Sequence, residues 1–83
     1  MYYVYILTCA DDTLYVGSTN NIEQRLYAHN NLKTGAHYTK IRRPVALVYT
    51  EECADRGSAQ SREAELKKLS RAEKQALISS NLQ

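Results

Sequence analysis

The stretch Tyr-Val-Gly-Ser-Thr-Asn-Asn at residues 15–21 decides how this chain begins to fold. A β-branched and aromatic run that ends in glycine and is followed at once by capping residues is typical of a strand leading into a helix. Residues 2–8, YYVYILT, form a second run of strand-forming residues just upstream. The connection between the two runs is too short for a crossover, so we expect an antiparallel hairpin.

The length of the hairpin loop decides which side chains share a face. A two-residue turn would place Tyr5 on the same face as Val16, whereas a three-residue loop over residues 10–12 pairs Tyr5 with Gly17. Only the three-residue loop separates the tyrosines from a coherent aliphatic face, made of Val4, Ile6, Leu14 and Val16. We therefore predict this register, with Tyr5 and Tyr15 as diagonal neighbours and Gly17 leaving room beside them.

The remaining pattern predicts an α+β fold with a small three-stranded antiparallel sheet flanked by helices, in the order β-β-α-(short turn or helix)-β-α-α. Residues 45–50, VALVYT, are almost continuously apolar and predict the most buried strand. Ser58 is the expected cap of a helix that runs to about Leu69. The predicted ranges are strands at 2–8, 13–18 and 45–50, and helices at 21–32, 58–69 and 71–79, with capping boxes at Asn20/Glu23 and Ser70/Glu73.

Length and composition indicate one domain over residues 1–83. The aromatic residues are seven tyrosines with no Phe or Trp, and buried tyrosine hydroxyls need partners, so some of them are expected to have a use. The start of the chain lacks the basic and then apolar run of a signal peptide, and no stretch approaches the length of a membrane span. We therefore expect a cytoplasmic protein with two reduced cysteines and no membrane partner.

The positive charge is concentrated in the middle of the chain. The segment from Arg25 to Tyr49 carries five basic side chains and no Asp or Glu, namely Arg25, Lys33, Lys40, Arg42 and Arg43. A segment of one sign is typical of a surface that binds a phosphate backbone. A basic, solvated face without a ligand is the alternative.

Val4-Tyr5-Ile6, then Tyr15-Val16-Gly17, Arg25 in the following helix and Glu63 in a later helix resemble the GIY-YIG nuclease family. Val4 departs from the glycine of the first motif, and Val16 replaces isoleucine in the second. The resemblance extends from Tyr2 to Ile78 and is closest to the small stand-alone, single-domain bacterial branch. The segments that carry this closer likeness are Tyr38-Thr39, Arg42-Arg43-Pro44-Val45, Ser61-Arg62-Glu63 and Lys67-Lys68.

The resemblance implies a DNA endonuclease that hydrolyses phosphodiester bonds with one divalent metal ion, Mg²⁺ or alternatively Mn²⁺. Glu63 falls on the position of the metal ligand, and one carboxylate is sufficient for Mg²⁺, which keeps several waters. Arg25 falls on the arginine that would stabilise the phosphate in the transition state. Tyr5, Tyr15 and His29 are the implied positions for orienting or deprotonating the attacking water, with Gly17 a structural residue of the site.

Each of these residues has a structural alternative. The tyrosines of a strand usually serve packing, and Arg25 could pair with Glu23. His29 could be a surface histidine. Glu63 could form an i,i+4 ion pair with Lys67. These alternatives remain open at the level of the sequence.

Five residues are expected to contact the DNA backbone outside the site, namely His37, Tyr38, Lys40, Arg42 and Arg43. No separate DNA-reading element is visible, so we expect selectivity for branched, damaged or single-stranded DNA in repair or recombination, with a protein partner as a source of specificity. Two other hypotheses remain. One is a catalytically weak nucleic-acid-binding module of the same fold, and the other is a small protein-interaction module with a basic surface.

Overall fold

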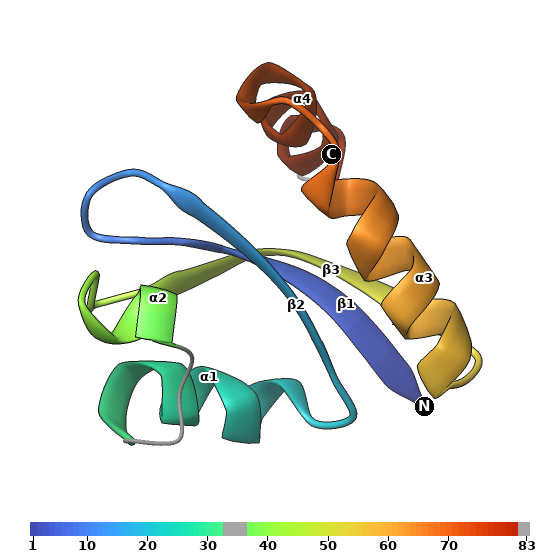
Figure 1. Ribbon diagram of the computed structural model, residues 1–83, viewed down its shortest axis with the longest axis horizontal. Helices are drawn as coiled ribbons and strands as arrows, with labels where there is room; N and C mark the ends of the chain where they lie inside the picture. The colour runs from blue at the N-terminus through green and yellow to red at the C-terminus, as the bar shows by residue number, and fades with distance from the viewer. Residues whose placement is uncertain (33–36, 82–83) are drawn as a thin grey trace.

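The computed structural model describes residues 1–32 and 37–81, and the elements within these ranges follow the predicted order (Figure 1). They are β1 (Tyr2–Thr8), β2 (Leu14–Thr19), α1 (Ile22–Asn31), α2 (His37–Lys40), β3 (Ala46–Cys53), α3 (Arg56–Lys67) and α4 (Arg71–Asn81). The three strands form one antiparallel sheet, so the predicted α+β class is confirmed. None of the helices in the described ranges has the length and apolar character needed to cross a membrane.

The hairpin of β1 and β2 has the predicted register. Tyr5 lies opposite Gly17 and Leu7 lies opposite Tyr15. The loop has three residues, because the backbone N–H of Cys9 donates to the carbonyl of Thr13 at 2.9 Å. Its last residue, Asp12, has φ 66°, a left-handed conformation that closes three-residue hairpins and that Asp tolerates.

The prediction that residues 45–50 form the most buried strand is wrong. The strand order is β2-β1-β3, so β1 is central and β3 lies at an edge. Four consecutive residues of β1 are buried, whereas in β3 only Tyr49 is. An apolar run fits a strand covered on both faces, but here it forms an edge strand on which Leu47 remains 37% exposed.

The two faces of the sheet are covered by different helices, and Figure 1 shows α1 and α2 on one side and α3 and α4 on the other. The α3/α4 face is aliphatic, with Val4, Ile6, Val16, Ala59, Leu66 and Ile78 buried there together with Tyr49. The α1/α2 face holds Tyr5, Leu7, Cys9 and Val45, with Tyr15, Ile22, Leu26 and Tyr38 packed against them. The predicted separation of aliphatic residues from Tyr5 and Tyr15 is therefore confirmed.

Two of the three predicted helix caps are corrected. Asn21, not Asn20, caps α1 by accepting from the N–H of Gln24. Asp55 caps α3 by accepting from the N–H of Ser58, the residue that the sequence suggested as the cap. The capping box of α4 is confirmed, because Ser70 and Glu73 exchange side-chain-to-backbone hydrogen bonds at 2.9 and 3.1 Å.

Candidate active site

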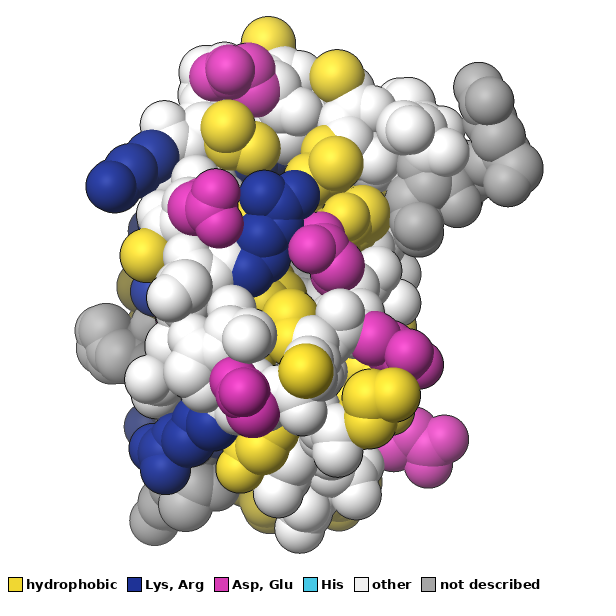
Figure 2. All heavy atoms as spheres, turned by 90° about the vertical axis from the view of Figure 1, so that its right-hand side faces the viewer, with side chains coloured by type: hydrophobic (Ala, Val, Ile, Leu, Met, Phe, Trp, Pro, Cys, Tyr) yellow, Lys and Arg dark blue, Asp and Glu magenta, His cyan; other side chains and the backbone are white. Residues whose placement is uncertain are grey.

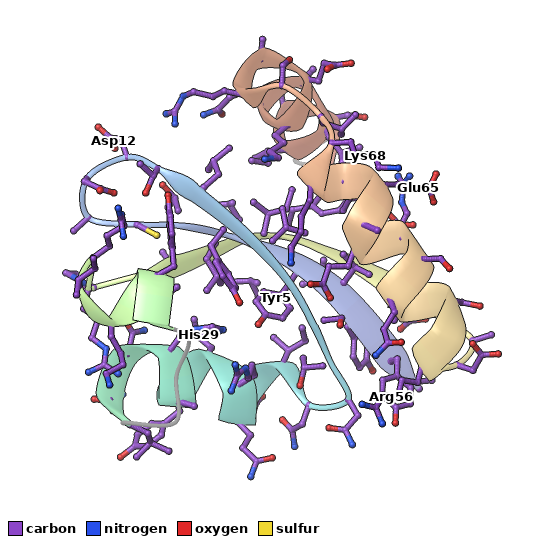
Figure 3. The ribbon with its side chains drawn as sticks, in the orientation of Figure 1. Tyr5, Asp12, His29, Arg56, Glu65 and Lys68 are labelled. Atoms are coloured by element: carbon purple, nitrogen blue, oxygen red, sulfur yellow. The ribbon has the colours of Figure 1, made fainter. Side chains whose placement is uncertain are left out.

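Tyr5 lies at the centre of the candidate site because it projects from the central strand toward α1. Its hydroxyl is 2.7 Å from Nε2 of His29, which projects from α1 toward the sheet, as Figure 3 shows. The ring of Tyr15 from β2 lies 6.5 Å from the Tyr5 ring and 5.1 Å from the His29 ring. The register of one hairpin and the first helix after it thus bring these three side chains together.

Gly17 makes room for this arrangement. A Cβ atom at this position would overlap the Tyr5 hydroxyl and would lie 3.1 Å from a ring carbon of Tyr15. The backbone of Gly17 does not have a positive φ, so glycine is required here for space rather than for its conformation. The strand opposite Tyr5 therefore has no side chain at the point where the Tyr5 ring crosses it.

His29 is completely buried, which decides against the alternative of a surface histidine. Its Nδ1 lies 2.7 Å from Oγ1 of Thr39 in α2, so both ring nitrogens have partners. Burial is the main cause that lowers its pKa to about 4, and the positive charges of Arg25 and Arg43 lower it further. His29 is therefore neutral at pH 7, with one nitrogen able to accept a proton.

Arg25 is also oriented toward Tyr5. Burial raises the pKa of the Tyr5 hydroxyl to about 12, and a hydrogen bond from Arg25 opposes this shift. Because the Tyr5 hydroxyl carries a hydrogen and neutral His29 has one unprotonated ring nitrogen, Tyr5 can donate to Nε2 of His29. Arg25 also lines an open hollow of about 380 Å³, together with Thr19, Gln24, Tyr27, Ala28 and Leu32.

Tyr38 and Arg42 extend the cluster of aromatic rings beyond Tyr15, on the side away from Tyr5. The Tyr38 ring lies 5.9 Å from that of Tyr15, and the Arg42 guanidinium covers it at 3.9 Å from the ring centroid. Arg42 also donates from Nε to Asp11 at 3.0 Å and from Nη1 to the carbonyl of Tyr38 at 3.1 Å. Both residues therefore have a structural role, since they connect α2 to the β1–β2 loop.

Arg43 binds the C-terminal end of α1. Its guanidinium donates to the carbonyls of His29 at 2.6 Å, Ala28 at 3.3 Å and Leu32 at 2.6 Å, at the helix end where carbonyls lose their partners within the helix. Lys40 is exposed at the end of α2. The side chain of His37 lies outside the described part of the structure, so its predicted contact with DNA stays a prediction.

Glu63 approaches from the other side of the sheet. It is on α3, and its Oε1 accepts from the Ser18 hydroxyl of β2 at 2.6 Å. Its Oε2 is 2.7 Å from Nζ of Lys67, so the alternative of an i,i+4 pair is present. Burial opposes ionisation of Glu63, but the hydrogen bonds from Lys67 and Ser18 outweigh it and lower the pKa.

The tyrosine site and Glu63 act on each other across β2, which is an edge strand. The negative charge of Glu63 contributes to the raised pKa of Tyr5, and Tyr15 contributes to the raised pKa of Lys67. Both effects require these groups to lie within electrostatic range of one another. The structure thus brings Tyr5, Tyr15, Arg25 and His29 together, and it places Glu63 on the other side of β2, in contact with Ser18 and within electrostatic range of Tyr5.

The donors present fit a metal ion held by one carboxylate. No group of three or more His, Cys, Asp or Glu side chains suited to a metal exists among residues 1–32 and 37–81. Glu63 is ionised at neutral pH and its side chain is 21% exposed, so it offers a charged oxygen that solvent can reach. Mg²⁺ commonly binds through one carboxylate and fills its other positions with water and substrate phosphate.

Three residues of the site were not proposed for it from the sequence: Ser18, Thr39 and Lys67. Thr39 lies 10 residues from its partner His29, and Ser18 lies 45 residues from its partner Glu63. Two signals were available: the i,i+4 spacing of Glu63 and Lys67, and the spacing of Ser18, which lies two residues after Val16 and therefore on the same face of the strand, toward α3 rather than Tyr5.

The comparisons with known proteins agree with this arrangement. A profile described as the GIY-YIG catalytic domain matches residues 1–76. A UPF0213 protein of Syntrophus aciditrophicus is 57% identical over 95% of this chain and 91% of its own length, and one of Clostridium perfringens is 56% identical over 96% and 85%.

Two solution NMR structures are similar to the whole fold. A protein of E. faecalis has a TM-score of 0.63 at 40% identity, covering 99% of this chain and 88% of that one. A UPF0213 protein of Bacillus halodurans has a TM-score of 0.60 at 40% identity, covering 95% and 84%. The strand order, the tyrosine pair and these matches lead to one conclusion: the chain belongs to the GIY-YIG family.

Proposed function

We propose that this protein is a DNA endonuclease that hydrolyses phosphodiester bonds with the help of one divalent metal ion, Mg²⁺ or alternatively Mn²⁺. Membership of the GIY-YIG family supports nuclease-type chemistry. The observation that carries the proposal is the Tyr5 hydroxyl, which lies 2.7 Å from Nε2 of His29 and whose pKa is affected by the charges of Arg25 and Glu63.

Tyr5 and His29 are proposed to move the proton of the attacking water. With a pKa of about 12, ionising Tyr5 in advance would cost roughly 7 kcal/mol at pH 7. A relay lowers this cost to about 4 kcal/mol at pH 7, which is the cost of protonating His29 at a pKa of about 4. In the relay, Tyr5 takes the proton of the water while it passes its own proton to Nε2 of His29, and Nδ1 of the same ring lies 2.7 Å from Oγ1 of Thr39.

Arg25 and Glu63 are proposed to bind the phosphate and the metal. Arg25 presents a permanent positive charge next to Tyr5, where negative charge develops on the phosphate oxygens. Glu63 would hold the metal ion, which when bound supplies Lewis-acid stabilisation of that charge. Tyr15 packs against both Tyr5 and His29 and is proposed to orient the water.

We further propose that the substrate is branched, damaged or single-stranded DNA in cytoplasmic repair or recombination. The backbone contacts would come from Lys40, His37, Tyr38, Arg42 and Arg43, although Arg42 and Arg43 also hold intramolecular partners. Such contacts position DNA without reading its sequence, so a protein partner would supply further specificity.

The test compares two tyrosines on opposite faces of the sheet. Tyr5→Phe removes the proposed relay, whereas Tyr49→Phe removes a hydroxyl that donates to Glu51 on the α3/α4 face. Mg²⁺-dependent cleavage of branched, single-stranded and duplex DNA should fall about 100-fold or more in Tyr5→Phe, and likewise in Arg25→Ala and Glu63→Gln. Tyr49→Phe should cleave like the wild type.

Equal rates for the wild type and all three site variants would defeat the enzyme proposal. If DNA binding persisted in that case, and weakened as salt rises, the protein would be a nucleic-acid-binding module of the same fold. The intramolecular bonds of Arg43 make Arg43→Ala a poor probe of binding, and Lys40→Ala is the better variant because Lys40 is exposed.

A further inference from the structure

The carboxylate of Glu63 is paired with the Lys67 ammonium. The Ser18 hydroxyl occupies Oε1 at 2.6 Å, and the Lys67 ammonium lies 2.7 Å from Oε2. The contact with Ser18 joins α3 to β2, so the carboxylate is held in one orientation. This differs from an ordinary ion pair on a helix surface, in which both side chains are free to move.

A metal ion and the Lys67 ammonium cannot share this oxygen at their usual distances. Mg²⁺ binds a carboxylate oxygen at about 2.0–2.1 Å, and the repulsion between a divalent ion and an ammonium at such separations is strong. Lys67 is able to leave, because its side chain is 54% exposed and ends in a flexible four-carbon stem. Ser18 can remain, since a neutral hydroxyl does not repel a cation.

We propose that Lys67 is the resident counter-cation of Glu63, which orients the carboxylate in the metal-free protein and weakens the binding of a divalent metal until it is displaced. This inference rests on the proposed metal site. It makes Lys67 a positioning residue that acts through Glu63. The affinity of the site for metal is then set by a side chain that does not itself bind the metal.

Lys68 provides a matched control. It is the neighbouring residue, it carries the same charge, it is exposed, and no ion pair of Lys68 occurs in the described part of the chain. Figure 3 labels it near the C-terminal end of α3. Lys68→Met therefore removes the same charge as Lys67→Met without freeing the Glu63 oxygen.

The experiment is a titration of the full chain with Mn²⁺, in which free Mn²⁺ is measured by its electron paramagnetic resonance signal. Lys67→Met should bind Mn²⁺ about three- to tenfold more tightly than the wild type. Lys68→Met should stay within about twofold, because a charge that is not on the carboxylate is largely screened. Lys67→Arg should restore weak binding, and Glu63→Gln should abolish it.

The outcomes separate the two proposals. If Lys67→Met and Lys68→Met change the affinity equally, or if Lys67→Met binds more weakly, the inference about Lys67 is overturned while the metal site stands. If none of the proteins shows binding that depends on Glu63, the metal site itself fails, and the role of Lys67 fails with it.

Discussion

Alternate residues of β1 point to the two faces of the sheet, and the interactions that they make on the two faces are different. On the α1/α2 face, Tyr5 is connected by hydrogen bonds to His29 and from there to Thr39. On the α3/α4 face, Val4 and Ile6 lie in a packed and mostly aliphatic cluster that also contains Tyr49. One face is therefore specified by the positions of polar atoms and the other by volume, so they should respond differently to substitution.

The exterior of the α3/α4 layer carries charges of both signs. Figure 2 looks onto the side of the molecule that carries α3 and α4, and it shows acidic and basic side chains interspersed with hydrophobic ones. Arg62 bonds to Glu51 at 3.0 Å on this side. A surface of mixed sign attracts a phosphate backbone less than a surface of one sign, and the proposed backbone contacts lie elsewhere, in α2 and the segment after it.

The largest effect is expected from Leu66→Ala, which removes a buried side chain from the core of the α3/α4 face. Leu66 is completely buried, so the loss of its side chain should lower the free energy of unfolding by about 2–5 kcal/mol. Urea denaturation measures this, with Leu47→Ala at the sheet edge as an exposed control. Cleavage per folded molecule should fall much less than in Tyr5→Phe, because the contact between Tyr5 and His29 lies on the other face of the sheet. A fall as large as that of Tyr5→Phe would show that the packing of α3, which also carries Glu63, controls the site.

A smaller effect is expected from Gly17→Ala, which acts on the α1/α2 face. The new methyl group would collide with the Tyr5 hydroxyl, so the variant should lose about 1–3 kcal/mol of stability and most of its cleavage. Gly57→Ala is the control, because a Cβ there lies 3.5 Å from Asp55 and alanine favours a helix. Full activity in Gly17→Ala would mean that the position of Tyr5 is not critical.

The smallest effect is a dependence of stability on pH, which we expect to arise from His29 on the α1/α2 face. The pKa of His29 is about 4 in the folded protein and 6.5 ordinarily, so between these values the unfolded chain binds a proton that the folded chain excludes. Stability is therefore full above pH 6.5 and falls with the pH, by about 2 kcal/mol between pH 7 and pH 5.

Urea denaturation at pH 7, 6 and 5 checks this dependence, with His29→Gln as the comparison. The variant should show a flatter profile over this range. An equally steep loss in both proteins would assign the pH dependence to other groups.

What the sequence could predict was decided by local patterns. The alternation of aliphatic and tyrosine residues on β1 and β2 was enough to choose the three-residue loop, because the other register would have mixed the two faces. The Ser70/Glu73 box was equally predictable, since both partners of the cap lie within one turn.

What the sequence could not predict depends on distant partners. An apolar run such as Val45 to Val48 does not reveal whether another strand will lie beyond it, so its place at the edge was missed. Asp55 and Ser58 are both capping residues three positions apart, and only the folded chain shows which accepts the hydrogen bond. The burial of His29 likewise depends on Tyr5, 24 residues away.

A ribosome that makes this chain releases the tyrosines, Arg25 and His29 of the candidate site before Glu63 and before the part of the fold that supports them. Tyr5, Tyr15, Arg25 and His29 all emerge within α1 and the strands before it, whereas β1 acquires its second neighbour only with residues 46–53. Until β3 is made, the nascent chain presents an unpaired edge of β1, and until α3 is made its aliphatic face is uncovered. Both features favour aggregation. Synthesis that stalls before α3 would therefore leave a hairpin with its tyrosines aligned and its opposite face open to other chains.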